Sequence, residues 1–205
     1  MRPSNRTTIL EAALRVLERD GGAHLSYDTV AGEAGLTKAG VMYHFATRED
    51  LVRAVVGHVA GRWDAAMRAV LGGDPADASP AARIGAYVEV AVTSDPSRAD
   101  VAVFADALYR PRHATPWRET FACWFDLDGC VDAAERARLT TARLAADGLW
   151  LARATDLFSP GRPGEQDHDA VAAGLLALTG TAPPTSGTTS GATPATTTPT
   201  AEVPA

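Results

Sequence analysis

The stretch Gly35-Leu36-Thr37-Lys38-Ala39-Gly40-Val41-Met42-Tyr43-His44-Phe45 contains a short helical segment with an unusual surface. An ordinary exposed helix fills its outer face with Glu, Lys, Gln and Arg, whereas this segment carries one lysine and several small residues. At about 100° per residue, Val41 and Phe45 share one face of the helix, and Ala39 and Tyr43 share the opposite face. One side is therefore predicted to pack inside a small domain, while the other stays flat, nearly uncharged and open to a large partner.

Helix caps and a turn surround this segment. Ser26 is predicted to cap a short helix that turns Val30, Ala31 and Ala34 inward, with Asp28 in its first turn. Gly35 then supplies a turn, and Thr37 can cap the next helix, which ends near His44. Two short helices joined in this way form a helix-turn-helix, whose second helix suits the DNA major groove.

The remaining sequence predicts further helices and no strands. A first helix carries Ile9 to Leu17 at helical spacing and ends at Gly21-Gly22. Thr47 with Asp50 resembles a capping box and starts a long helix that ends near Leu71. Further helices fit the ranges 79–94, 97–110, 113–126, 132–157 and 166–179, with Gly and Pro breakers between them. The predicted fold class is all-α.

Composition and charge limit the possible functions. The chain has 205 residues and a formal net charge of -6, so any DNA-binding surface must be local. Residues 181–205 consist almost wholly of Thr, Pro, Ala, Ser and Gly, which predicts a disordered tail. The two cysteines, Cys123 and Cys130, have no metal-binding spacing, and we expect buried, reduced thiols. No signal peptide or membrane-length apolar run is seen, so a cytoplasmic protein is expected.

Ten residues are predicted to bind DNA. Thr37, Tyr43 and His44 can donate to phosphates, helped by the backbone N–H groups of helix N-termini. Lys38 is expected to read a guanine, and small or apolar side chains to touch thymine methyl groups. The full set is Ser26, Tyr27, Thr37, Lys38, Ala39, Gly40, Met42, Tyr43, His44 and Arg48. As the alternative, Tyr43 and His44 merely pack at the end of a helix. For Lys38 the alternative is an ordinary lysine in contact with solvent.

Three runs of sequence together resemble a known family. They are ILEAAL (9–14), VAGEAGLT (30–37) and YHFATREDL (43–51). They resemble the N-terminal domain of TetR-family transcriptional regulators over about residues 5–55. The resemblance implies an all-helical homodimer, a C-terminal ligand pocket, and operator binding relieved by a small molecule. It places Lys38, Tyr43, His44 and Arg48 where that family usually contacts DNA.

The sequence departs from the common family pattern inside the second helix of the motif. Val41-Met42 stands where many members have Leu-Tyr, and Gly40 where they often have Thr or Asn. Direct readout of bases through hydrogen bonds is therefore expected to be limited. The expected domains are a helix-turn-helix DNA-binding domain at 1–46, a helical ligand-binding and dimerisation domain at 47–180, and the tail at 181–205.

Aromatic and apolar residues of the second domain are candidates for a ligand site. The predicted lining is Trp63, Met67, Tyr87, Phe104, Tyr109, Trp117, Phe121 and Trp124, with Phe125 and Trp150 as further aromatic candidates. Each could instead be plain core. His113 is a possible ligand contact or a helix-end histidine. Glu165, Asp167, His168 and Asp169 suggest either a metal site or, as we expect, an acidic first helical turn. We predict no metal and no cofactor.

Dimerisation is expected through the helices at 132–157 and 166–179. Their small and apolar residues allow close packing against a second copy: Ala142, Leu144, Ala145, Gly148, Leu149, Leu151, Ala152, Val171, Leu175, Leu176 and Leu178. A ligand beside Trp63 and Met67 would tilt the long helix that starts at Thr47, and so change the spacing of the two DNA-reading helices.

The predicted function is that of a homodimeric repressor, released from a palindromic operator by a small-molecule effector. An activator on the same fold stays open, as does a helical sensor or carrier that has lost DNA binding. An enzyme is disfavoured because no nucleophile–base pair or signature motif is present. The effector, the operator sequence and the role of the tail do not follow from the sequence.

Overall fold

The computed structural model describes residues 4–20 and 25–180, and the regular elements in these ranges are all helical. This confirms the all-α class. The predicted tail and the Gly21-Gly22 helix end lie outside the described residues. The elements are α1 (Asn5–Asp20), α2 (Tyr27–Ala34), α3 (Lys38–His44), α4 (Arg48–Leu71), η1 (Pro75–Asp77), α5 (Pro80–Thr93), α6 (Arg98–Tyr109), η2 (Pro111–Ala114), α7 (Thr115–Phe121), α8 (Ala133–Thr155) and α9 (Gln166–Thr179).

The predicted helix caps are present. The Ser26 hydroxyl accepts from the backbone N–H of Thr29, and the Thr29 hydroxyl accepts from that of Ser26, which completes a capping box. Thr47 and Asp50 form a second capping box at the start of α4. Gly35 ends α2 in the left-handed conformation, with φ 65° and ψ 31°. Because the ends of α2 and α3 are fixed locally, their relative orientation follows from a short stretch of sequence.

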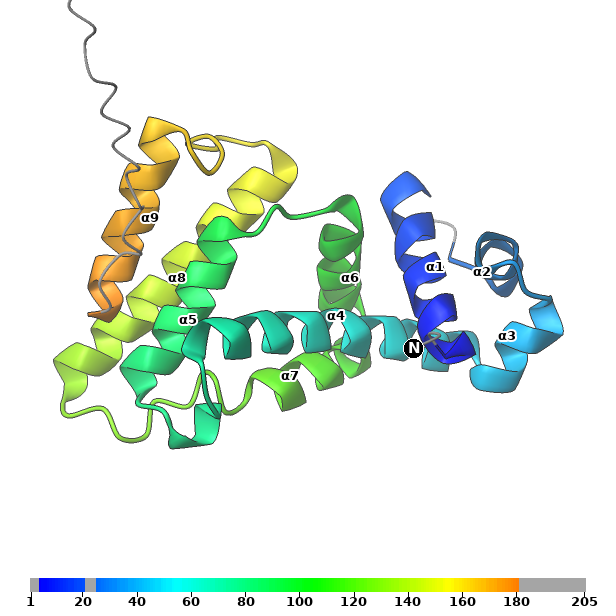
Figure 1. Cartoon of the computed structure of the whole chain (residues 1–205), viewed down its shortest axis with the longest axis horizontal. Helices are drawn as coiled ribbons and strands as arrows, with labels where there is room; N and C mark the ends of the chain where they lie inside the picture. The colour runs from blue at the N-terminus through cyan, green and yellow to red at the C-terminus, as the bar shows by residue number, and fades with distance from the viewer. Residues whose placement is uncertain (1–3, 21–24, 181–205) are drawn as a thin grey trace, which may run out of the picture.

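The helices divide into two groups joined by α4 (Figure 1). Helices α1 to α3 lie at one end of the molecule, and α5, α8 and α9 at the other. A first hydrophobic core joins α1–α3 to the start of α4 and to Ala99 and Val103 of α6. A second core joins the end of α4 to α5, α7, α8 and α9. Trp63 and Trp117 pack against both cores, so these side chains connect the two groups.

One predicted helix and several burial states differ from expectation. In place of a helix at 113–126, the 3-10 helix η2 precedes α7, which ends at Phe121. The chain continues in turns, with the Phe125 N–H still donating to the Phe121 carbonyl at 3.0 Å. Proline at the start of both elements explains the break, because it favours a helix start and lacks an N–H donor. Cys123 and Cys130 are half-buried free thiols rather than buried ones.

The predicted interface helices expose only part of the expected face. Ala142, Leu149, Leu175 and Leu176 are buried within the protomer itself, in the second core. Leu144, Leu151 and Val171 are exposed, as are Gly148, Ala173, Gly174 and Ala177. The small and apolar residues of these helices therefore lie on two faces: one packs into the second core of the protomer, and the other is exposed to solvent. Within the described ranges, no helix has the length and apolar character required to cross a membrane.

Candidate nucleic-acid interface and internal cavity

The outer face of α3 is open to solvent. Val41 is fully buried and Phe45 is 3% exposed, so these two side chains anchor the helix from behind. On the other side Tyr43 is 86% and Met42 44% exposed, and Ala39 is exposed as well. The half-buried His44 ring and the Tyr43 ring form a T-shaped pair, with their centroids 5.3 Å apart. The structure thus presents a low surface of small and aromatic residues, as the helical wheel predicted.

The first turn of α3 combines a cap, a cation and a glycine. The Thr37 hydroxyl accepts from the Gly40 N–H at 3.0 Å, and Lys38 Nζ lies 3.0 Å from Asp28 Oδ2 of α2. Lys38 and Asp28 are both well exposed. A Cβ added to Gly40 would lie 3.3 Å from the Thr37 hydroxyl oxygen, so glycine leaves this cap undisturbed. Any DNA contact of Lys38 competes with Asp28, an acid that the sequence reasoning did not weigh.

Besides Thr37 and Lys38, three more of the predicted DNA-binding residues have partners inside the protein. Ser26 closes the capping box of α2. The Tyr27 hydroxyl donates to the Phe45 carbonyl at 2.8 Å, and burial raises the pKa of Tyr27, with a smaller contribution from Asp50. Arg48 Nε donates to the Leu25 carbonyl at 2.8 Å. Tyr27 thus joins α2 to the end of α3, and Arg48 joins the start of α4 to the segment before α2. Both bonds leave fewer donors for DNA.

Arg6 is a basic residue near α3 that the sequence reasoning missed. It is exposed in the first turn of α1, and its guanidinium lies over the Phe45 ring, 5.0 Å from the centroid. Its position in α1, nearly forty residues before Phe45, hides this proximity in the sequence. Arg6 adds a positive charge beside the end of α3.

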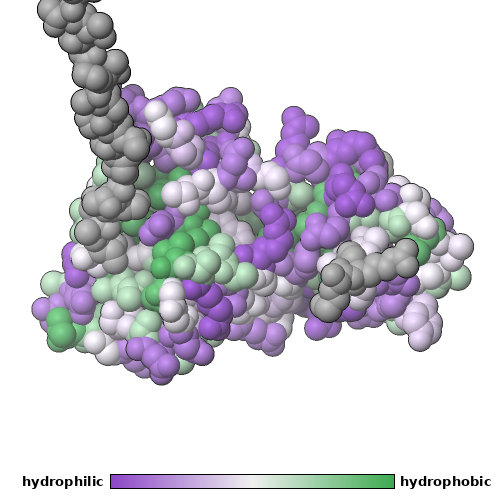
Figure 2. Space-filling model, in the orientation of Figure 1, coloured by the Kyte–Doolittle hydropathy of each residue, from purple (hydrophilic) through white to green (hydrophobic). Residues whose placement is uncertain are grey.

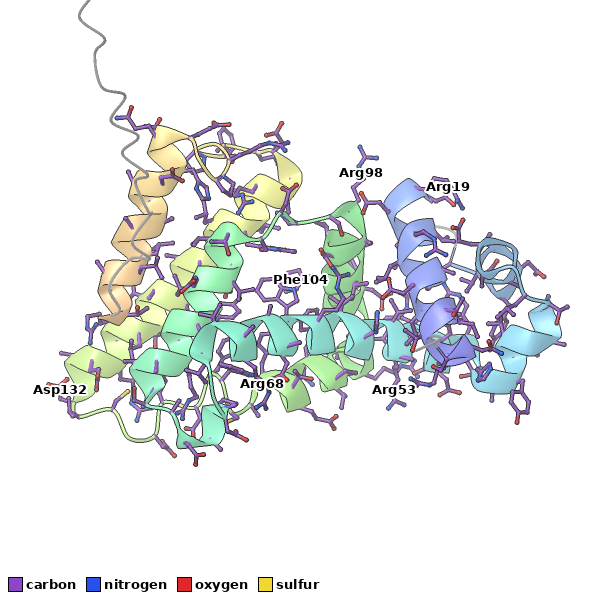
Figure 3. The ribbon with its side chains drawn as sticks, viewed as in Figure 1. Arg19, Arg53, Arg68, Arg98, Phe104 and Asp132 are labelled. Carbon is purple, nitrogen blue, oxygen red and sulfur yellow. The ribbon has the colours of Figure 1, made fainter. Side chains whose placement is uncertain are left out.

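A cavity of about 520 Å³ lies between α4, α5, α6, α7 and α8. Five of the eight predicted ligand residues line it: Trp63, Tyr87, Phe104, Trp117 and Phe121. Phe104 and Leu151, at the margin, are 43% and 44% exposed. Phe104 points from α6 into the space above α4, and an apolar area covers this region of the surface (Figures 2 and 3). The cavity therefore opens to solvent on this face.

The other three predicted ligand residues lie away from the cavity lining. Met67 and Trp124 are fully buried in the second core, where Trp124 Nε1 donates to Asp64 Oδ1 at 2.8 Å. Tyr109 is 84% exposed at the end of α6. Helical spacing placed Trp124 beside Trp117 and Phe121, but α7 ends at Phe121, and the turn that follows directs Trp124 into the core.

Charged residues that the sequence reasoning did not predict also line the cavity: Asp100, Arg118, Arg143 and Asp147. The Tyr87 hydroxyl donates a hydrogen bond to Asp147 Oδ1, and Arg143 Nη1 lies 3.2 Å from Asp147 Oδ2. Burial raises the pKa of Asp147, against the opposing effects of Tyr87 and Arg143. Burial and Asp147 together raise the pKa of Tyr87 well above its usual value. Phe125 and Trp150 complete the aromatic wall.

The histidine and acidic candidates serve local structure. His113 is buried in η2, where Nδ1 pairs with Asp106 and Nε2 lies 3.9 Å from Glu49. Asp169 accepts from the Gly164 N–H at 2.9 Å, and this bond, together with His168, lowers the pKa of Asp169. Over the described part of the chain, no group of three or more metal-ligating side chains comes together.

Two family models match the chain. "Bacterial regulatory proteins, tetR family" matches residues 9–55, which contain the helix-turn-helix. "Tetracyclin repressor-like, C-terminal domain" matches residues 81–180, which contain most of the cavity lining. Among the curated proteins, no relative matches the sequence.

Solved structures of similar proteins cover most of the chain. A TetR-family member from Streptomyces coelicolor A3 is 26% identical, with a TM-score of 0.56 over 86% of this chain and 98% of that one. The multidrug binding protein EbrR, complexed with malachite green, is also 26% identical, with a TM-score of 0.56 and the same coverage. A putative transcriptional regulator from Streptomyces coelicolor A3(2), at 22% identity, has a TM-score of 0.61 over 87% of this chain and all of that one, which shows the shared fold.

The N-terminal match coincides with the exposed α3, and the C-terminal match with the helices around the cavity. Proteins of this family are in general DNA-binding regulators rather than enzymes. The chain belongs to the TetR family of transcriptional regulators.

Proposed function

We propose that the protein is a homodimeric repressor that binds a palindromic operator in the cytoplasm and is released by a small molecule in the cavity. The observation that carries the proposal is the exposed face of α3, on which Ala39, Met42 and Tyr43 are uncovered while Val41 and Phe45 are buried. A helix anchored in this way can enter the major groove without rearrangement of its domain.

In this proposal, side chains of α3 and its neighbours divide the contacts between bases and phosphates. Lys38 reads a guanine, and Ala39 and Met42 touch thymine methyl groups; each such pair discriminates by about 1–3 kcal/mol at best. Thr37, Tyr43 and His44 bind phosphates, and Arg48 can do so through the N–H groups not donated to Leu25. Arg6 joins this set because of its place beside Phe45. We reassign Tyr27 to positioning α3, since its hydroxyl is donated to the Phe45 carbonyl.

The dimer contact is proposed on the exposed faces of α8 and α9. The apolar and small residues Leu144, Gly148 and Leu151 lie on α8, and Val171 and Gly174 on α9. Small residues allow the helices of two copies to approach closely, and a two-fold axis then matches two half-sites about one helical turn apart. Leu144→Glu should give a monomer in light scattering, while Val70→Glu on α4, exposed to 40%, should not.

The effector site is proposed in the cavity because that space touches α4. Trp63 of α4 lines the cavity, and the same helix begins at Arg48, near the DNA-facing surface. A ligand that shifts Trp63 would therefore change the position of α3 in each protomer. The structures of EbrR with ethidium and with malachite green support a similar use of the domain in this protein.

The test is fluorescence anisotropy with labelled DNA from upstream of the protein's own gene. Tyr43→Ala should weaken binding about tenfold or more, the scale of a lost charge-assisted contact to phosphate. Phe158→Ala is the matched control, because Phe158 is a fully exposed aromatic residue that follows α8, in the other group of helices. Equal affinities for the two variants would remove α3 as the reading helix. Cavity binding by a protein with no affinity for any upstream DNA would instead favour the sensor or carrier.

A further inference from the structure

A fixed carboxylate faces the cavity at Asp147. The Asp147 side chain keeps 39% of its surface exposed, so a molecule in the cavity can reach it. Its two oxygens have different partners: the Tyr87 hydroxyl on one, and the Arg143 guanidinium, one helical turn earlier in α8, on the other. Tyr87 is itself 8% exposed and packed among aromatic rings, so it holds the carboxylate in place.

The Arg143 guanidinium is the less constrained partner in this cluster. One hydrogen bond is seen from it within the described structure, at 3.2 Å to Asp147, although a guanidinium has five N–H donors. It also lies over the Phe125 ring, 5.0 Å from the centroid. A long arginine side chain at the edge of a cavity can turn into water, whereas the short Asp147 side chain cannot follow it.

Arg143 therefore marks a place where the cavity already holds a cation. The place consists of one ring face from Phe125 and one carboxylate from Asp147, which together favour a flat positive group. Further rings continue from it: the Phe125 and Phe121 centroids are 5.3 Å apart, and those of Phe121 and Trp117 are 5.4 Å apart. A cation bound here would have extended aromatic surfaces beside it.

We propose that the effector is a flat aromatic cation that displaces the Arg143 guanidinium, pairs with Asp147 and packs against the neighbouring rings. The proposal rests on the proposed function, in that it takes the cavity to be the effector site. It adds the chemical class of the effector and the residue exchange by which the effector is bound. A volume of about 520 Å³ is of the size that holds drug-sized molecules.

The other charged lining residues do not favour an anion. Asp100 Oδ2 accepts from both the backbone N–H and the hydroxyl of Ser97 in the cap of α6, and a carboxylate in the lining repels an anion. Arg118 is exposed to solvent, where water weakens its attraction for a ligand. An anion that displaced Arg143 would lie against the Asp147 carboxylate. Burial already raises the pKa of Asp147, so its charge needs a cation nearby, and a cationic ligand supplies one when Arg143 leaves.

The direct test measures dye binding to the full chain by fluorescence, without DNA, since ethidium also intercalates into duplexes. Asp147→Asn should weaken ethidium about tenfold or more, because the amide keeps the shape of the carboxylate but not its charge. Uncharged 6-phenylphenanthridine, which has the same ring system, should change less than about threefold. Arg143→Gln should tighten ethidium several-fold, because it removes the competing cation.

The two variants are expected to change ethidium affinity in opposite directions, so the test is decisive. If Asp147→Asn lowers stability too far in thermal unfolding, Arg143→Gln still gives an answer. Weaker ethidium binding by Arg143→Gln, or unchanged binding by Asp147→Asn, would overturn the proposal. Tighter binding of the anion 8-anilinonaphthalene-1-sulfonate than of ethidium, lost in Arg118→Gln, would do the same in favour of an anionic effector.

The outcome is independent of the regulator assignment. Operator affinity of the unaltered protein is measured separately, with no dye present. If the protein does not bind the operator but both variants change ethidium binding as expected, the repressor function is rejected and the cation site stands. If the operator binds normally but Arg143→Gln weakens ethidium binding, or Asp147→Asn leaves it unchanged, the cationic effector is rejected and the repressor function stands.

Discussion

The carboxylate of Glu18, in α1, accepts a hydrogen bond from the backbone N–H of Ala99, in the first turn of α6, at 2.9 Å. It lies at the N-terminus of α6, where the helix dipole favours a negative charge. The same helix carries Phe104 in the cavity lining and Val103 in the core shared with α1. Helix α6 therefore contacts both the cavity and the group formed by α1–α3, by a route separate from α4.

Removal of this contact should weaken the connection between the two groups of helices. We expect Glu18→Ala to lower the free energy of unfolding by about 0.5–1.5 kcal/mol, the usual value of such a bond. It should also raise the dye concentration that half-releases the operator. Urea denaturation and anisotropy measure the two effects. Glu119→Ala, an exposed glutamate of α7, is the control; equal changes in both variants would argue against the α6 route.

Trp63 tests the route through α4. Its ring lies 5.8 Å from Tyr87 and 6.2 Å from Trp150, centroid to centroid, so we expect a ligand that separates these rings to shift α4. Trp63→Ala should raise the half-releasing ligand concentration about tenfold, within the usual range of coupling energies. Trp124→Phe is the matched control, since it loses the bond to Asp64 in the core without touching the cavity. An unchanged response in Trp63→Ala would exclude this route.

Gly35 and Gly61 should respond oppositely to alanine. Gly35 has φ 65°, and a Cβ there meets nothing within 4 Å, so the penalty comes from the backbone conformation alone. Gly35→Ala should therefore cost about 1 kcal/mol, and Gly35→Asn less. Gly61 lies inside α4, also with open space, and Gly61→Ala should stabilise by about 0.5–1 kcal/mol. Thermal unfolding gives both values; a stabilising Gly35→Ala would contradict the assigned turn.

Asp28 forms an ion pair with Lys38, and we expect this pair to restrain Lys38 from reaching DNA. Their 3.0 Å ion pair must break before Lys38 can read a base, and Asp28 is a negative charge beside the DNA-facing surface. Asp28→Asn should tighten operator binding several-fold, with the largest gain at low salt. Asp77→Asn, an exposed acid in η1, is the control and should have little effect. Weaker binding by Asp28→Asn would mean that the pair positions Lys38 for DNA rather than restraining it.

Glu33 should make the stability of the α1–α3 group depend on pH in the acid range. Hydrogen bonds from Arg15 and then Arg19 lower the pKa of Glu33 below its ordinary value. Because the folded pKa is the lower one, this stabilisation is present above the ordinary pKa and is lost as the pH falls through the folded pKa. Glu33→Gln should lower the melting temperature at neutral pH, and the difference should shrink below about pH 4. A difference that grew in acid would contradict this assignment.

Local signals in the sequence predicted the helix starts well. Thr47 with Asp50, Ser26, and the turn at Gly35 act through neighbouring backbone groups, so their roles follow from adjacent residues. The last helix spans Gln166–Thr179 as expected. The anchored and exposed faces of α3 followed from helical geometry alone.

The cavity was less predictable, because helical periodicity shows which residues share a face of a helix but not what that face packs against. Trp63 and Met67 lie one turn apart on α4, yet the first lines the cavity and the second is fully buried in the core. Asp147 and Arg143 read as an ordinary ion pair on a helix surface. Their importance depends on Tyr87, sixty residues away in the sequence, and no local pattern connects the two.

The identity of the residue at position 38 has a practical consequence for chemistry in solution. Lys38 is the sole lysine of the sequence, and more than half of its side-chain surface is accessible. Amine-selective acylation would thus place its one ε-amide adduct on α3. With α3 in the operator as proposed, protection of that nitrogen in mass spectra would report operator occupancy in the unaltered protein.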